Sequence, residues 1–260
     1  MSFIDIVEYE DRFRALDDRD HYSRRAEQYP DIGHYLSVIR LIVDDSQPKP
    51  IIDPVAADRL VAGSQLLSRL DSDYSELTCG PVPLDRQLTV LTSPMAGRTG
   101  RGLTPDAAKF TDLDSGTVIK AATKPFEVGF FTSTEYAPNH NMWRDYLDMY
   151  PRSTLHPRPW RTWRVSPMPD NDIAEVTRAQ DWSDLVRAHP MPHDGLLFPD
   201  WNSIAEKYDA IHMTVRAIVA MQGLRLSTPD GVIAPTYWDV ESTFWLHWRF
   251  TSTELVDIAT

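Results

Sequence analysis

The spacing of apolar residues in the first third of the chain is helical. Apolar positions recur every three or four residues in three stretches, 3–16, 35–42 and 54–70. Two prolines separate the second stretch from the third, and proline cannot occupy the interior of a helix. Asp53 precedes Pro54, an order typical of a helix N-cap followed by a proline in the first turn. The sequence therefore predicts a helical segment up to about residue 80.

After residue 80 the pattern changes to short runs in which apolar and polar residues alternate. Such alternation predicts strands, here at 88–93, 117–120, 127–134 and 241–250. Helical spacing returns in three segments, 142–150, 172–188 and 201–208, and Asp200 is a plausible N-cap of the last one. The segment 210–221 fits either a long strand or a buried helix, and its pattern does not distinguish them.

Together these elements predict an α+β fold in two regions. Residues 1–80 form a helical N-terminal region packed on the core. Residues 81–260 form a mixed, largely antiparallel β-rich core with inserted helices, which we expect to carry any catalytic site. With 42% apolar and 10% aromatic residues, the chain has enough apolar side chains for such a core.

The net charge of −12 argues against broad, sequence-independent binding to nucleic acid, which requires many lysines and arginines. One basic stretch departs from this balance: between Arg152 and Arg164, arginines alternate with tryptophans. This pattern is typical of side chains that stack on bases or hold a phosphate. It is also typical of a surface loop in which arginine stems cover indole rings, and this interpretation is favoured because no surrounding positive charge supports a basic patch. A nucleic-acid partner therefore stays open through this loop alone.

Cysteine and histidine usage limits the classes of chemistry. A single cysteine, Cys79, fits a reducing compartment, no apolar run is long enough for a membrane span, and the first residues lack a signal-peptide pattern. We therefore expect a cytoplasmic protein without membrane contact. The closest grouping of metal-ligating residues is His189, His193 and Asp194. The prolines between the histidines exclude a helical metal motif, so we predict a structural loop and no metal site, with a hydrolase based on these residues as a distant alternative.

The loop Gly97–Gly102 combines three glycines with Arg98 and Arg101. Glycines let the backbone approach a ligand closely, and arginines provide forked donors, so this loop suits a diphosphate or another anion. The alternative is a flexible, solvated turn.

Two further polar clusters interrupt apolar strands. Thr132, Ser133 and Thr134 place three hydroxyls at the end of a strand, where they need partners if buried, although threonine also simply favours strands. Asp239 and Glu241 would share one face of an extended chain beside two tryptophans, which can desolvate a carboxylate. The alternative for this pair is a solvated loop.

In this order the three clusters resemble the ADP-ribosyltransferase superfamily. Its members commonly carry an early arginine or histidine, then a Ser-Thr-Ser-like strand, then a Glu/Gln-x-Glu near the last strands. The resemblance implies that Arg98 or Arg101 holds the pyrophosphate or ribose of NAD. Ser133 would support the nicotinamide ribose and the catalytic acid, Glu241 would bind the ribose 2′-hydroxyl, and Asp239 would help to orient the acceptor.

The resemblance also implies NAD as a substrate and a protein or small molecule as the acceptor. It makes Glu241, Asp239 and Ser133 the catalytic set. The expected NAD-binding residues are Arg98, Arg101, Thr132, Thr134, Phe131 and Tyr136, with the aromatic side chains stacking on nicotinamide. The resulting expectation is an NAD-dependent ADP-ribosyltransferase or NAD glycohydrolase. The alternative is a non-enzymatic protein-interaction module, suggested by eight tryptophans and twenty prolines.

Overall fold

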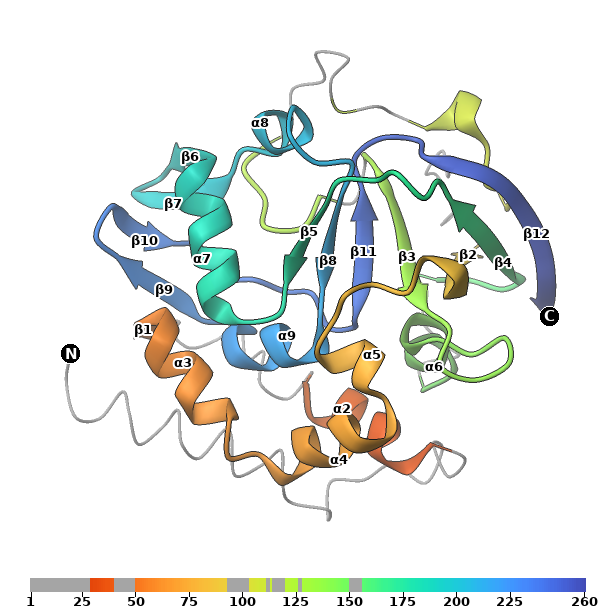
Figure 1. Ribbon diagram of the computed structural model, residues 1–260, viewed down its shortest axis with the longest axis horizontal. Helices are drawn as coiled ribbons and strands as arrows, with labels where there is room; N and C mark the ends of the chain where they lie inside the picture. Colours follow the sequence, from red (N-terminus) through yellow and green to blue (C-terminus); the bar gives the residue numbers. More distant parts are fainter. Residues whose placement is uncertain are drawn as a thin grey trace.

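The structure, a computed structural model, contains two mixed β-sheets with helices placed between and beside them (Figure 1). It describes residues 29–39, 50–92, 103–110, 113, 120–125, 128–149 and 156–260. The larger sheet has seven strands in the order β12-β4-β2-β3-β11-β8-β5. Their bounds in that order are Phe250–Ala259, Trp160–Pro167, Gln87–Thr92, Phe130–Thr134, Ser242–Trp245, Ala210–Met213 and Ile173–Val176.

The smaller sheet has five strands in the order β1-β9-β10-β7-β6. Their bounds are Ile51–Ile52, Arg225–Thr228, Gly231–Ile233, Leu196–Pro199 and Pro190–His193. β6 and β7 form a hairpin whose two-residue turn is Asp194-Gly195, and both residues have positive φ (47° and 76°). Asp-Gly is favoured in such turns because glycine adopts positive φ without strain.

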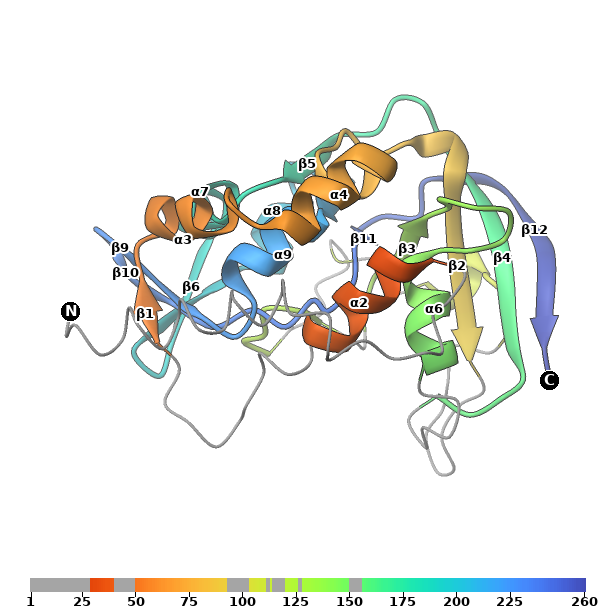
Figure 2. The ribbon, with the colours of Figure 1, turned by 90° about the horizontal axis from the view of Figure 1, so that it is seen from below.

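The α-helices in the described ranges come from early, middle and late parts of the sequence and pack on both sheets. They are α2 Pro30–Ile39, α3 Pro54–Val61, α4 Gln65–Asp73, α5 Ser75–Thr78, α6 Met142–Met149, α7 Ala179–Ala188, α8 Trp201–Ala205 and α9 Val215–Met221. Two short 3₁₀ helices, η3 Leu84–Arg86 and η4 Ala107–Lys109, complete the set. In Figure 1, α2 to α5 lie along the lower side of the molecule. Figure 2 shows β2, β4 and β12 side by side at one end, near α2 and α6.

This arrangement corrects the predicted fold class, because the fold is mixed α/β and its helices are not gathered in the N-terminal third. α7 and α9 each lie between two strands of the later chain, and both pack against α3. Both sheets are mixed: among the described strands, seven pairs are antiparallel, and three pairs, β5–β8, β1–β9 and β10–β7, are parallel. A parallel pair needs a crossover connection, and α7 and α8 lie in the connection between β5 and β8.

Several predicted elements are confirmed, with shifted limits. Asp53 caps α3 by accepting the amide of Ala56 at 3.0 Å, but the predicted long helix 54–70 is broken into α3 and α4 because Ser64 caps a new helix. The ambiguous segment 210–221 contains both alternatives, β8 followed by α9. The predicted helices at 142–150 and 201–208 are α6 and a shorter α8. The helix predicted at 3–16 and most of the strand predicted at 117–120 lie outside the described residues.

Two other predicted elements were wrong. The helix predicted over 172–188 begins with a strand, β5, and becomes helical only at Ala179. The strand predicted over 241–250 ends at Trp245, and a second strand, β12, starts at Phe250 on the other side of the sheet. In both cases residues between the two elements turn the chain, and the apolar pattern continues across the turn without marking it.

One apolar core joins helices and strands from distant parts of the chain. It includes Leu36 of α2, Ala57 of α3, Ile218 of α9 and Phe244 of β11, all essentially fully buried. Burial of apolar side chains is the main stabilising contribution to a fold. No helix in the described part of the chain is both long and apolar enough to cross a bilayer.

The strand β12 forms one edge of the seven-stranded sheet and pairs with β4 over most of its length. Its register is interrupted twice, between Phe250 and Ser252 and between Leu255 and Asp257. Such interruptions are β-bulges, which bend a strand and increase its twist.

Candidate functional site

The carboxylate of Glu241 is the centre of a buried polar cluster between β3, β8 and β11. It accepts the hydroxyl of Ser133 at 2.7 Å and both the amide (3.0 Å) and the hydroxyl (2.9 Å) of Thr134. Nε2 of His212 lies 3.1 Å from its Oε1 atom. The Glu241 side chain has no exposed surface. Both carboxyl oxygens of Glu241 therefore accept hydrogen bonds from neighbouring side chains or backbone.

The sheet register explains why residues so far apart in sequence meet. Thr243 of β11 lies opposite Thr132 of β3 and opposite His212 of β8. Glu241 precedes Thr243 by two positions, so an extended chain directs both side chains to the same face. Glu241 therefore reaches the end of β3, where Ser133 and Thr134 are located.

A chain of hydrogen bonds with a defined direction leads to this carboxylate from Trp245 of β11, through residues of β3 and β2. The indole of Trp245, which can only donate, gives its proton to the hydroxyl of Thr132 at 2.9 Å. Thr132 then donates to Oε1 of Gln87 at 2.5 Å, and Nε2 of Gln87 donates to the hydroxyl of Thr134 at 3.2 Å. The hydroxyl of Thr134 in turn donates to Glu241. The hydroxyls of Thr132 and Thr134, which were identified from the sequence, therefore help to orient the side chain of Glu241.

On its other side the cluster continues through a second carboxylate. Nδ1 of His212 lies 2.5 Å from Oε2 of Glu175 on β5, and Oε1 of Glu175 accepts the amide of Val82 at 2.9 Å. His212 is fully buried, whereas 28% of the Glu175 side chain is exposed. Burial lowers the pKa of His212, but its hydrogen bonds to Glu175 and Glu241 outweigh this effect and raise the pKa to about 9. His212 is therefore an imidazolium ion at neutral pH.

Asp239 does not share the site with Glu241, contrary to the expectation from an extended chain. Its backbone has a φ of 47°, which turns the chain before β11 begins. Its carboxylate accepts the side-chain amide of Gln222 at 2.7 Å, and its carbonyl accepts the hydroxyl of Tyr35 at 2.8 Å. Asp239 therefore fixes the loop that leads into β11, and Tyr35 of α2 holds the same loop.

The aromatic residues expected to stack on nicotinamide occupy two different places. Phe131 is stacked on Phe244, with ring centroids 4.6 Å apart, and the ammonium of Lys124 lies 5.2 Å from the Phe131 ring centroid. Burial lowers the pKa of Lys124 to about 8, opposed by the charge of Asp239. Phe131 thus lies beside a cation on the face of β3 that also carries Ser133.

Tyr136 belongs to a separate polar and aromatic cluster next to α6. Its hydroxyl donates to Asp145, whose other oxygen lies 3.1 Å from Nδ1 of His140. Its ring meets those of Tyr29 and Tyr74 edge to face, with centroids 5.1 and 5.3 Å away. Burial, with a smaller effect of Asp148, raises the pKa of Asp145 to about 8. Tyr136 is already engaged in these contacts and is not aimed at Glu241.

The arginines of the predicted sites have different outcomes. Arg98 and Arg101 lie outside the described residues. The described part of the stretch 152–164 includes part of β4, an inner strand, and two of its arginines, Arg158 and Arg164, make intramolecular contacts. Arg164 pairs with Glu135 at 2.8 Å, and the Arg158 guanidinium lies 4.4 Å from the ring centroid of the buried Trp160. These contacts match the interpretation in which arginines cover indole rings.

No cluster of three metal-ligating side chains occurs among the residues that the structure describes. His189 instead bonds the hydroxyl of Ser203 at 2.8 Å, and His193 faces solvent beside Asp194. The eight tryptophans suggested a protein-interaction module, but none of them is strongly exposed at the surface. Five of them are core residues: Trp160, Trp182, Trp201, Trp238 and Trp245.

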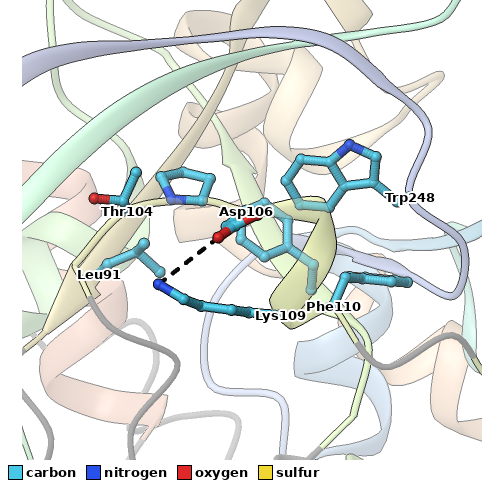
Figure 3. Close-up of a pocket in the computed structure, with 8 residues that line it drawn as sticks. Leu91, Thr104, Asp106, Lys109, Phe110 and Trp248 are labelled. Carbon is cyan, nitrogen blue, oxygen red and sulfur yellow. Dashed lines mark ion pairs between the residues drawn. The ribbon is translucent and has the colours of Figure 1, made fainter.

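A surface hollow lies at the opposite end of β3 from the Glu241 cluster (Figure 3). It contains about 270 Å³ of empty space, part of it open to solvent. Its floor is apolar, and an ion pair between Lys109 and Asp106, 3.7 Å apart, lies at its rim. The lining residues are Leu91, Thr104, Pro105, Asp106, Lys109, Phe110, Phe130 and Trp248.

Two functional candidates, His212 and Glu175, did not emerge from the sequence. His212 interrupts the apolar run Ala210–Met213, and a buried histidine there requires a polar partner, which was a usable signal. Glu175 lies in a segment interpreted as helix, so its position opposite His212 in a parallel strand pair could not be anticipated.

Comparison of the chain with protein families, with curated proteins and with solved structures gave no match.

Proposed function

We propose that this protein cleaves the bond between nicotinamide and ribose in NAD and transfers ADP-ribose to an acceptor or to water. The observation that carries the proposal is the 2.7 Å hydrogen bond from Ser133 to Glu241, which joins two residues 108 positions apart in sequence. It matches the arrangement implied by the resemblance, in which a serine at a strand end supports the catalytic glutamate. The adjacent Thr134 adds two further hydrogen bonds to the same carboxylate.

The chemistry of the cluster fits this reaction. When the glycosidic bond breaks, its electron pair leaves with nicotinamide, and positive charge develops on the ribose. A carboxylate held by fixed donors stabilises that charge more strongly in the transition state than in the ground state. The acceptor, or water, then bonds to the ribose carbon and releases a proton.

Burial of Glu241 sets one requirement for the proposal. Because the carboxylate is fully covered, the residues around it must move when substrate binds. Tyr35 of α2 lies in this region: it is fully buried and donates its hydroxyl to the Asp239 carbonyl. Burial raises the pKa of Tyr35 well above its usual value, and the charges of Asp239 and Glu241 add to this effect.

NAD is a substrate in this proposal and not a resident cofactor. The acceptor is a protein or a small molecule, and recognition of NAD phosphates is assigned to Arg98 or Arg101. A cytoplasmic location agrees with this function, since NAD is present there and the exposed thiol of Cys79 remains reduced.

The test is a nicotinamide-release assay with NAD, with and without added acceptor proteins. Wild-type protein should release nicotinamide, and Glu241→Gln should lower kcat by roughly 100-fold or more. Ser133→Ala, which removes one donor and leaves the carboxylate in place, should lower kcat by roughly tenfold. Circular dichroism spectra would establish that both variants are folded.

Glu135→Gln is the matched control. Glu135 follows Thr134 directly but pairs with Arg164 and does not contact Glu241, so its replacement should leave nicotinamide release unchanged. Absence of nicotinamide release by the wild-type protein would refute the proposal, as would equal rates for wild type and folded Glu241→Gln.

A further inference from the structure

His212 lies in a buried position between two carboxylates. Its two ring nitrogens are 2.5 Å from Glu175 and 3.1 Å from Glu241, and both contacts are ion-pair distances. A carboxylate can only accept, so a histidine that bonds one through each nitrogen must carry both protons. The Glu175–His212–Glu241 chain is thus a cation between two anions.

The sheet builds this chain from three separate strands. Glu175 lies directly opposite His212 in the parallel pair β5–β8, and Glu241 is the residue immediately before β11. The loop before β2 completes the arrangement: Val82 donates its amide to Glu175. A β-carbon added at Gly80, whose φ is 65°, would lie 2.9 Å from Oε2 of Glu175. Glycine therefore suits this position, because it adopts positive φ without strain and leaves room for the carboxylate.

A buried carboxylate is stable only when a counter-ion and hydrogen bonds compensate its loss of hydration. Ser133 and Thr134 provide neutral donors to Glu241, and His212 provides the positive charge. The ionisable groups facing this histidine and its partner are Glu175 from β5, Glu241 at the start of β11 and Tyr35 from α2. All three of these groups are acidic, so His212 is the group in this cluster that can offset the charge of Glu241.

We propose that His212, held by Glu175, is a positioning residue that keeps Glu241 ionised and fixes its orientation towards Ser133. This inference rests on the proposed function for its effect on NAD cleavage. Its effect on the ionisation of Glu241 does not depend on that function. Since neither His212 nor Glu175 contacts substrate in this role, their replacement should change kcat and its pH dependence more than KM.

The kinetic test compares wild type with His212→Gln, Glu175→Gln and Glu175→Asp in the nicotinamide-release assay. His212→Gln should lower kcat by roughly tenfold or more with little change in KM. The alkaline limb of the kcat–pH profile should reflect loss of a proton from His212. Glu175→Gln should move this limb to a pH about one unit lower, because His212 loses a partner that favours its charged form. Glu175→Asp keeps the negative charge and should move this limb less. Glu135 lies outside the Glu175–His212–Glu241 chain, so Glu135→Gln should leave the alkaline limb unchanged.

The second readout is isotope-edited infrared spectroscopy of the Glu241 carboxyl group, measured on the folded full chain. Wild-type protein should show a carboxylate band at neutral pH, and His212→Gln should show a carboxylic-acid band. An ionised Glu241 in His212→Gln, together with an unchanged kcat, would overturn the inference and leave the proposed function intact. If wild type shows no NAD cleavage, the proposed function fails, and the infrared comparison alone decides whether His212 controls Glu241.

Discussion

Replacing Gly129 with alanine should destabilise the protein by about 3 kcal/mol, through two separate effects. Gly129 has a φ of 64°, where an alanine side chain costs about 1 kcal/mol. The new β-carbon would also lie only 2.1 Å from the Phe244 ring and 2.7 Å from the carbonyl of Trp245. Phe244 is fully buried, stacked on Phe131 and in edge contact with Trp201. Its ring cannot move freely, so overpacking adds about 1–3 kcal/mol.

Gly195→Ala separates these two effects. Gly195 has a φ of 76°, similar to that of Gly129, but a β-carbon there would meet no atom within 4 Å. Its replacement should therefore cost only the backbone strain, about 1 kcal/mol. The difference between the two variants measures the overlap with Phe244.

Urea unfolding of wild type and both variants, followed by tryptophan fluorescence, provides the free energies of unfolding. Gly129→Ala should have a clearly lower midpoint than Gly195→Ala, at similar slopes. Equal losses of stability in the two variants would refute the reasoning, since Phe244 would then yield at no cost. Such a result would mean that this part of the core packs loosely.

Two further predictions concern the surroundings of Glu241. The pKa of His212 is raised from 6.5 to about 9, so its contribution to stability, up to about 3 kcal/mol, is fully present below pH 6.5 and is lost as pH rises through about 9. The stability difference between wild type and His212→Gln in urea unfolding should shrink over that range, and a constant difference would show that His212 is not charged. Tyr35→Phe should cost about 1–2 kcal/mol, because the carbonyl of Asp239 loses its 2.8 Å hydrogen bond within a buried region. Unchanged thermal stability of this variant would contradict that role.

The part of the site that could be predicted depended on local sequence patterns. Three hydroxyls at the end of an apolar strand had to find partners if buried, and Ser133 and Thr134 find Glu241. The placement of Asp239 could not be predicted, because alternation assumes an extended backbone and the chain turns at Asp239 itself. One residue in the left-handed region was enough to direct its carboxylate to Gln222.

The fold class was less predictable than the individual elements. Most helices and strands are identifiable from their apolar spacing, but their order in the sheets depends on pairing between distant segments. β5 illustrates the difficulty, since it is only four residues long and its polar Glu175 has a partner 37 positions away. No pattern within residues 172–188 records that His212 will lie opposite.

The outer edge of β12 has a consequence for association between molecules. An unpaired edge strand presents backbone donors and acceptors to which a strand from another copy can add, and Leu255 and Ile258 are among the exposed apolar side chains here. The two bulges interrupt the regular spacing of these backbone groups, and the exposed, negatively charged side chain of Glu254 would repel the same side chain on a second copy. The strand therefore completes the sheet of its own molecule while discouraging the growth of that sheet into an aggregate.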